Sequence, residues 1–564
     1  MDREIARDAS FVGALTCDAE AVRGDADAVV AVFDQALGGR YSLEPGPRRV
    51  RSITYLDSAD WRLHRKGVVL AHERGSGAGT LTVRSGKGVA TAALAEQPSW
   101  PAMAHELPDE VRTLVDSPLW IRAVQPVVHG RVVTRYVRVH DTGGTAVAVL
   151  AWRETAVSEP VRIEPFVRVD VALAGEEGSV KAAKRVRKVL RRHDSGRFRT
   201  TSADPYPDVL AAAGLPDRPE PPAITPDLPA GVAVARALRA QAAALEATID
   251  GTIADTDTEY LHDLRVAVRR TRSLLKLADD VLPTRLTTRY AREFAWLGEV
   301  TSPVRDLDVY LLGFEDLTRR LVAADPADLE PFAADLRRRR ETARRALVRS
   351  LRTKRFARLM QDWTAELAEL SRVPGDDTPG TGAPDGDVSD GDVSDGDVSG
   401  GRAGADDAAA DGPADPGPDV AAFVRRRLVA TAKKVTKRAA AITPESPADD
   451  VHDLRKRCKE LRYLLEFAEP LCPRAEHSAV VKRLKRLQDI LGAFQDGEVQ
   501  SLDLKEQAAR LSESGRAPVE TLLAMGELAG TFAVDQQRAR HELTAALCRF
   551  LGEDMRKRIG ALVA

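Results

Sequence analysis

The sequence has few of the residues that point to a metal, redox or membrane protein. It contains only four cysteines, and none of them stands in a CxxC pair or at another metal-ligand spacing, which argues against a zinc site. No stretch reaches about 18 consecutive apolar residues, the length that a membrane-spanning helix needs. The first ten residues, MDREIARDAS, lack the apolar segment of a secretory signal. We therefore expect a soluble cytoplasmic protein without a cofactor, a metal ion or a membrane contact.

Aromatic residues are also scarce, at 5% of the chain, whereas charged residues reach 30%. The formal net charge of −2 says little about binding partners, because the charges are segregated along the chain. Residues 375–418 hold twelve aspartates and a single basic residue, Arg402, so the regions on either side are net basic. The GDVSD-like pentads in this segment lack the hydrophobic positions of a calcium-binding β-roll. We expect a disordered acidic insert.

The hydrophobic pattern changes along the chain, and 564 residues are too many for one core. Residues 1–205 read as short strands between Gly- and Pro-bearing turns, and the Pro-rich residues 206–229 predict a linker. A helical period begins near residue 230, and the acidic insert divides that region into 230–374 and 419–564. The predicted strands are Arg49–Leu56, Gly67–His72, Thr80–Arg84, Arg131–Val139, Ala146–Trp152 and Phe166–Leu173, with helices at Ala26–Leu37 and Glu177–Arg192.

An internal repeat is the most informative feature of the sequence. The segment His262–Pro283 (HDLRVAVRRTRSLLKLADDVLP) aligns without a gap on His452–Pro473 (HDLRKRCKELRYLLEFAEPLCP), and Leu297–Val309 aligns on Leu487–Val499. Both matches have the same offset of 190 residues. The repeat predicts a duplicated all-helical module, with a bundle of about four helices in each copy and a pseudo-twofold relation between the copies.

Each repeat carries a cationic stripe on one face of a helix. At about 100° per residue, the stripe lies opposite Leu264, Val268, Thr271 and Leu275, which we expect to face the core. Cations at i, i+4 spacing repel one another unless an anion binds. The alternative is a solvated charged face, which the duplication of the pattern disfavours. The stripe residues are His262, Arg265, Arg269, Arg272 and Lys276 in the first repeat, and His452, Arg455, Lys456, Lys459 and Arg462 in the second.

These residue types suit phosphate. Arginine presents a planar fork of donors to phosphate oxygens, lysine adds a compact charge, and protonated histidine donates from both ring nitrogens. A stripe of about three helical turns spans several phosphates, which predicts a polyanion as the ligand. For Arg305, which precedes Asp306, an ion pair between packed helices is the alternative. Additional basic contacts are predicted at Arg305, Arg344, Arg355, Arg427, Lys434, Lys482 and Arg486.

The repeated HDLR…R…R…LL…P helix, followed by LG…RDLDV, resembles the CHAD domain, the conserved histidine α-helical domain. The resemblance covers about residues 230–560. It implies two four-helix bundles around a basic cavity that binds inorganic polyphosphate, together with localisation to polyphosphate granules. By this resemblance the stripe residues are the candidate polyphosphate-binding residues.

The N-terminal region resembles the CYTH, or triphosphate tunnel, fold through Tyr55–Arg74 and the strands around it, which implies an antiparallel β-barrel. Active members carry an ExExK strand whose carboxylates hold a divalent ion. Here the corresponding residues are Glu4, Ala6 and Asp8, and the late E-x-E position reads Asp170-Val-Ala172. We therefore expect a degenerate domain without catalytic or metal-ligating residues. Arginines are kept on the strands, and their alternation would let Arg49 and Arg51 both line a tunnel; the alternative for each arginine is the polar outer face of the barrel. The set is Arg49, Arg51, Arg74, Arg84, Arg131, Arg135 and Arg138.

The leading hypothesis is an α+β protein that binds polyphosphate as a scaffold or targeting module and catalyses no reaction. The first alternative is a metal-dependent triphosphatase or polyphosphatase of the CYTH type. Its substitute metal ligands are Glu73, Glu106, Glu154, Glu164 and Asp170. The second alternative is a nucleic-acid binder, which the scarcity of aromatic residues for base stacking disfavours. Nucleic acid is expected only as a weak competitor.

Overall fold

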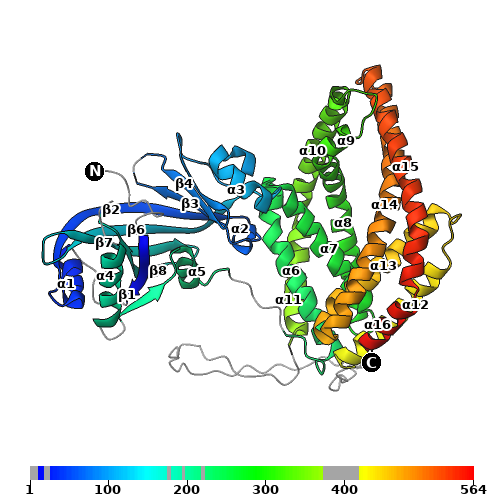
Figure 1. Cartoon of the computed structure of the whole chain (residues 1–564). Helices are drawn as coiled ribbons and strands as arrows, with labels where there is room; N and C mark the ends of the chain where they lie inside the picture. The colour runs from blue at the N-terminus through cyan, green and yellow to red at the C-terminus, as the bar shows by residue number, and fades with distance from the viewer. Residues whose placement is uncertain are drawn as a thin grey trace, which may run out of the picture. The chain divides into compact units, whose positions relative to one another are not determined.

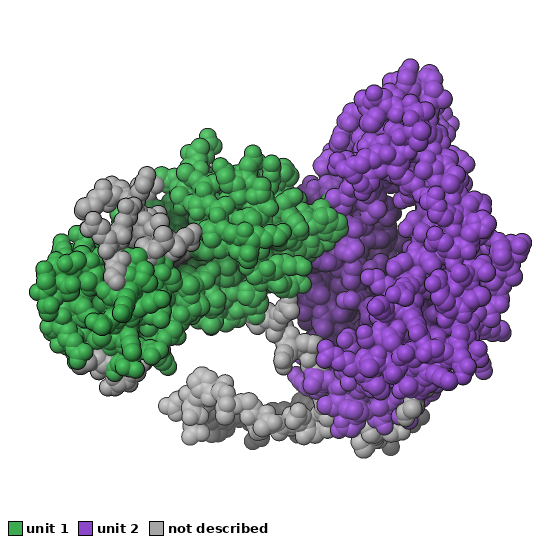
Figure 2. All heavy atoms as spheres, viewed as in Figure 1, with its two compact units in different colours: residues 1–219, 256–259 green, residues 220–255, 260–564 purple. Residues whose placement is uncertain are grey.

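A computed structural model describes residues 11–17, 26–75, 77–174, 180–193, 197–216, 223–372 and 418–563. The chain divides into two compact units, residues 1–219 with 256–259 and residues 220–255 with 260–564 (Figures 1 and 2). No helix in the described ranges is both long enough and apolar enough to span a membrane. Apart from Pro418, the predicted acidic insert lies outside the described residues.

The first unit is built on one antiparallel sheet (Figure 1). Its strand order is β5-β4-β3-β2-β6-β7-β8-β1-β9. All six predicted strands and both predicted helices are present. The strands are β1 (Phe11–Cys17), β2 (Ser42–Asp57), β3 (Val69–Arg74), β4 (Thr80–Ser85), β5 (Gly88–Ala93), β6 (Gln125–His140), β7 (Ala146–Glu159), β8 (Ile163–Ala172) and β9 (Phe198–Thr201). The helices are α1 (Ala26–Leu37), α2 (Arg62–Arg65), α3 (Asp109–Leu119), α4 (Val180–His193) and α5 (Tyr206–Ala212).

Alternation along the central strands gives the sheet two different faces. Leu150, Trp152 and Val169 share a buried core with α1 and α4, and Phe33 of α1 meets the ring of Trp152 edge-on, with centroids 5.7 Å apart. The residues between them on the same strands point to the other face. That face carries a polar pocket.

The antiparallel sheet is confirmed, but its closure into a barrel is not. β5 and β9 are the outer strands, and in the described residues they pair only with β4 and β1. Each outer strand is covered by a helix: Ala92 of β5 shares a core with Val111 of α3, and Phe198 of β9 shares one with Leu190 of α4. Because packed helices protect these strands, the sheet has no need to close on itself.

The predicted linker begins later in the structure than residue 206. Helix α5 occupies the start of that range, and its Tyr206, Val209 and Leu210 are buried. The ring of Tyr206 lies 4.9 Å from the ring of Tyr55 of β2. The first unit therefore includes this helix.

In its described residues the second unit is built from helices, as predicted. α6, α7 and α8 begin 190 residues before α12, α13 and α14, so the duplication extends to a helix before the two sequence matches. Five helices of more than ten residues are described in each copy, rather than about four. The first copy has α6 (Ala230–Ala254), α7 (Thr258–Leu277), α8 (Thr284–Leu312), the short α9 (Phe314–Thr318), α10 (Glu330–Leu351) and α11 (Lys354–Leu370). The second has α12 (Val420–Ala440), α13 (Ala448–Ala468), α14 (Arg474–Glu513), α15 (Val519–Phe550) and α16 (Glu553–Val563).

One hydrophobic core runs through both copies, so they do not form two separate bundles. Leu264 and Leu275 of α7 lie in the same core as Leu454 and Leu465, their equivalents on α13. All four are at most 2% exposed. The apolar side that the helical period predicts for α7 is therefore confirmed.

The two copies meet at a short bridge between equivalent residues. Pro229 lies opposite Asp419 in an antiparallel bridge. Beside it, the Ala230 amide donates to the Pro418 carbonyl (3.0 Å), and the Val420 amide donates to the Leu228 carbonyl (2.8 Å). Because Pro229 and Asp419 are related by the repeat offset, the bridge lies where a pseudo-twofold axis must pass.

Candidate functional site

The two cationic stripes converge inside the second unit. Burial lowers the pKa of Lys459 on α13 to about 8, and the charges of Arg455 and of Arg269 on α7 add to the effect. The side chains of Arg269, Arg272 and Lys459 make neither a hydrogen bond nor an ion pair with any other described residue. Cations from both repeats thus gather, and three of their side chains make no salt bridge to a carboxylate in the described residues. We call Arg265, Arg269, Arg272, Arg455 and Lys459 the cationic cluster.

The equivalent residues Arg265 and Arg455 are held differently. Arg265 is half-buried and donates to the Gly298 carbonyl (3.2 Å) and to the hydroxyls of Thr301 (3.0 Å) and Ser302 (2.9 Å) on α8. Desolvation lowers its pKa. Arg455 has only a long ion pair with Asp496 of α14 (3.8 Å), and its buried Nε has no hydrogen-bond partner in the described residues. Arg455 therefore keeps more donor capacity for a ligand.

Asp306 and Asp496, which were not predicted as site residues, face the two stripes. Partial desolvation raises the pKa of both carboxyls, and Arg265 and Arg455 respectively oppose that rise. These two acids are related by the repeat offset, which is the sequence signal that could have identified them. The predicted Arg305 also lies in this neighbourhood, because its charge contributes to the lowered pKa of Arg265.

The two histidines lie beside the cluster, half-buried on α7 and α13. The Nδ1 atom of His452 is 2.6 Å from the Oε1 atom of Gln495. The residue equivalent to Gln495 in the first copy is Arg305, so the neighbourhood of His262 carries more positive charge. The hydrogen bond orients the His452 ring and leaves Nε2 for a second contact.

The first stripe continues into a pocket of about 410 Å³ between α7, α12 and α13, here called the α12 pocket. Its cationic residues are Arg269, Arg272 and Lys276 of α7 and Arg427 and Lys434 of α12. The pocket thus joins two of the predicted additional contacts to the stripe.

Acidic neighbours already engage part of this charge. Arg427 Nη2 donates to Asp279 (2.5 Å) and Asp280 (2.6 Å), and Lys276 bonds to Glu460. Lys434 is exposed and makes no ion pair within the described ranges. Like Arg269 and Arg272, it is therefore an exposed cation of the pocket that no described acid engages in an ion pair.

Several predicted contacts have other partners in the structure. Arg462 bonds to Glu466 through Nε (3.0 Å), and Arg344 pairs with Asp255 (3.1 Å). Arg355 binds Glu293 (2.9 Å) and lies over the Trp296 ring. Arg344 and Arg355 therefore hold neighbouring helices together, and this packing role explains both residues without a ligand.

Lys456, Lys482 and Arg486 are exposed. At 100° per residue, Lys482 and Arg486 lie about 80° and about 120° around α14 from Gly492, whose α-carbon faces Arg455. Lys485 lies within about 20° of that direction. Helical phase therefore favours Lys485 over the two predicted residues.

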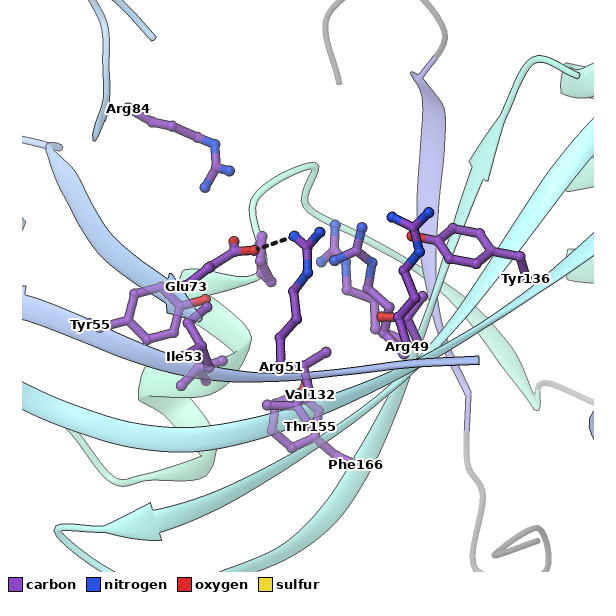
Figure 3. Close-up of a pocket in the computed structure, with 15 residues that line it drawn as sticks. Arg49, Arg51, Ile53, Tyr55, Glu73, Arg84, Val132, Tyr136, Thr155 and Phe166 are labelled. Atoms are coloured by element: carbon purple, nitrogen blue, oxygen red, sulfur yellow. Dashed lines mark hydrogen bonds and ion pairs between the residues drawn. The ribbon is translucent and has the colours of Figure 1, made fainter. Parts of the chain in front are cut away.

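A second candidate site lies on the polar face of the sheet in the first unit (Figure 3). Arg49 and Arg51 of β2 point to the same side, as their spacing predicted, and they line a narrow pocket with Arg84 of β4. Arg153 and Arg168 complete its arginines. The prediction missed Arg153 because it ended one strand at Trp152, whereas β7 continues to Glu159. Arg168 lies within the predicted strand Phe166–Leu173 but was not named as a candidate. The other predicted strand arginines, Arg74, Arg131, Arg135 and Arg138, are not among the lining residues.

Arginines engage the acids on this face, so the described residues do not fit a divalent metal ion. Glu73 binds Arg51 (3.2 Å), and Asp170 binds both Arg153 and Arg168 (2.8 Å each). Within the described ranges, no three His, Cys, Asp or Glu side chains are placed to hold a metal. The stretch with Glu4, Ala6 and Asp8 lies outside those ranges.

The remaining substitute ligands do not converge on this pocket. Glu154 accepts from Arg135 (2.6 Å) and from the Trp152 indole (3.0 Å). Glu106 accepts from the Met103 amide (2.5 Å). Neither Glu106, Glu154 nor Glu164 is among the lining residues.

Comparison with known proteins places a named domain on the helical unit. Residues 236–505 match the family model of the CHAD domain. The CHAD domain of the plant Ricinus communis is similar, with 24% identity over 59% of this chain and 96% of that one, at a TM-score of 0.44. PptA from Streptomyces chartreusis is similar at 18% identity over 56% and 99%, at 0.37.

The N-terminal region has structural neighbours of a different kind. A putative adenylyl cyclase from Hippeastrum, described as having a dominant triphosphatase activity, shares 12% identity over 36% of this chain and 96% of its own, at a TM-score of 0.24. None of the curated proteins matches the chain.

Residues 236–505 of this chain form a CHAD domain.

Proposed function

We propose that the helical unit binds inorganic polyphosphate through the cationic cluster and localises the protein to polyphosphate granules. The observation that carries this proposal is the gathering of Arg269, Arg272 and Lys459 from two repeats without a salt bridge to any described acid. Lys459 is half-buried beside these like charges, and this destabilises the unliganded fold. A bound polyanion reverses the sign of that interaction.

The extent of the site favours a chain of phosphates over a single one. From His262 to Lys276 the first stripe rises about 21 Å along its helix. Its continuation into the α12 pocket adds Arg427 and Lys434. Single-stranded nucleic acid is less suited, because base stacking needs aromatic platforms, and Tyr463 is the only aromatic residue among those that line the α12 pocket.

Calorimetric titration of the full chain with long-chain polyphosphate tests the proposal. The variant R269A/K459A should bind at least about tenfold more weakly, since each charge-assisted contact contributes about 1.5–3 kcal/mol. The control K354A/R358A removes two exposed cations from α11 and should bind like the wild type. Equal affinity of both variants would contradict the proposal.

A second candidate function belongs to the arginine pocket of the first unit. Five arginines line it together with one carboxylate, Glu73, which suits a short anion such as triphosphate. Because the described carboxylates are engaged by arginines, we propose binding without hydrolysis. Incubation with triphosphate or ATP and Mg²⁺ or Mn²⁺ should release no phosphate, whereas metal-dependent release that Glu4→Ala abolishes would establish the enzyme instead.

A further inference from the structure

The α12 pocket has a counterpart on the other side of the pseudo-twofold axis. A pocket of about 590 Å³ between α6, α7 and α13, here called the α6 pocket, is built from repeat-equivalent positions. Leu274 and Tyr463 line both pockets. Five residues of the α6 pocket are the repeat equivalents of residues that line the α12 pocket. The pairs, with the α6 pocket first, are Ala237 and Arg427, Gln241 and Thr431, Glu466 and Lys276, Phe467 and Leu277, and Glu469 and Asp279.

The two pockets have kept their shape but not their charge. Five cations and two carboxylates line the α12 pocket, so its net formal charge is positive. Two cations and two carboxylates line the α6 pocket, and their charges cancel. The decisive changes are Ala237 for Arg427 and Glu466 for Lys276. Only one of the two pockets can therefore attract a polyanion.

Glu466 also ends the second stripe. It binds Arg462 of its own helix (3.0 Å) and Arg270 of α7 (3.2 Å). The equivalent contact on the other side, Lys276 with Glu460, has the signs exchanged. As a result the first stripe ends in a cation, Lys276, that lines the α12 pocket. The second stripe ends in a carboxylate, Glu466, that lines the α6 pocket.

We propose that the α12 pocket is a second contact site for bound polyphosphate. The polyphosphate chain extends from the cationic cluster into the α12 pocket and not into the α6 pocket. This inference rests on the proposed function and specifies its ligand. A chain long enough to reach Arg427 and Lys434 gains contacts that a short chain lacks. The helical unit thus prefers long polyphosphate and binds it in one path rather than two equivalent ones.

The variant R427A/K434A should lose affinity for long-chain polyphosphate but keep its affinity for tripolyphosphate. Its affinity for the long chain should fall at least about tenfold, as expected for two lost charge-assisted contacts. Its affinity for tripolyphosphate should stay within about twofold of the wild type, because the cluster is intact. The control R425A/R426A removes two exposed cations from the same helix that do not line the pocket, and it should bind both ligands normally.

Two further variants keep the test independent of folding. Lys434→Glu changes an exposed residue without an ion pair in the described ranges, and it should also weaken only long-chain binding. Glu466→Gln removes the closing carboxylate and should raise long-chain affinity about two- to threefold. If the wild type binds no long-chain polyphosphate, the proposed function is wrong and this inference with it. If the wild type binds and R427A/K434A and Lys434→Glu bind equally well, the second contact site alone is wrong.

Discussion

The two copies of the helical module keep the same helices at the same offset, yet they treat equivalent charges differently. Arg265 is anchored by Ser302, whereas the place of Ser302 beside Arg455 is taken by Gly492. Lys276 continues the first stripe, and Glu466 ends the second. The apolar positions that build the shared core are conserved between the copies, as Leu264 and Leu454 show. Packing therefore preserved the fold after duplication, while the exposed charges were free to diverge.

The largest expected effect comes from reversing charge in either copy. We expect R265E/R269E and R455E/K459E each to weaken polyphosphate binding by at least about 100-fold, since two contacts are lost and two repelling carboxylates are added. Both pairs contribute to one cluster, so one pair suffices. Titration with polyphosphate measures the loss, and circular dichroism checks the fold.

Stoichiometry distinguishes one site from two. If each copy bound a chain separately, a single reversal would leave about half the binding capacity at near-native affinity. That result would contradict the joint cluster. Unchanged binding with both pairs reversed and the fold intact would show that the stripes are solvated charged faces.

An intermediate effect is expected for Lys459→Met. The folded-state pKa of Lys459, about 8, is below its ordinary value of 10.5. The protonated side chain therefore destabilises the fold below pH 8, and stability is regained as pH rises from about 8 to about 10.5. The variant should gain about 1 kcal/mol of unfolding free energy at pH 7, after allowance for solvent screening. Urea unfolding at pH 7 and pH 9.5 should show this gain shrinking at the higher pH; a loss of stability at pH 7 would contradict the repulsion.

Binding should respond to pH in the opposite sense. A bound polyanion favours protonated Lys459 and raises its pKa above 8, so the contribution of Lys459 to affinity should be constant below pH 8 and fall above it. In Lys459→Met this decline should be largely absent. Fluorescence titrations between pH 7 and pH 9.5 measure it, and an identical decline in the variant would assign the effect to another group.

The smallest effect should follow from giving Arg455 the same hydroxyl anchor that Arg265 has. Gly492→Ser supplies Arg455 with the hydroxyl that Ser302 gives Arg265, and the added Cβ would lie 3.8 Å from Arg455 Nη2, at ordinary contact distance. We expect a gain of about 0.5 kcal/mol from helix propensity and an affinity reduced by less than about threefold. Thermal unfolding and titration are the measurements. A large loss of stability would mean that Gly492 is needed for close packing.

The sequence predicted what depends on local periodicity and missed what depends on distant partners. The stripe on α7 and its buried opposite face follow from a period of 3.6 residues, and the repeat offset placed a second stripe on α13. The predicted roles of Arg344 and Arg355 depend on Asp255 and Glu293, which lie far away in the sequence. A charge pattern along one helix cannot show that such acids lie on a neighbouring helix.

In the first unit, local reasoning identified the strands but not their closure. The spacing of Arg49 and Arg51 predicted their common face because side chains alternate along a strand. Arg153 was missed because the predicted strand ended at Trp152, before the end of β7. Asp170, which the sequence suggested as the remnant of a metal site, binds two arginines instead. Whether the outer strands pair with each other depends on the helices that cover them, which the strand pattern does not contain.

The most direct test of the central claim is the affinity of the full chain for long-chain polyphosphate as a function of salt. With about 0.7 counterions released per neutralised phosphate and at least four phosphates bound, log affinity against log salt should have a slope steeper than about −3. Tripolyphosphate and single-stranded DNA of matched charge should bind more weakly under the same conditions. A long-chain affinity that stays flat from low to physiological salt would contradict polyanion binding by the cationic cluster.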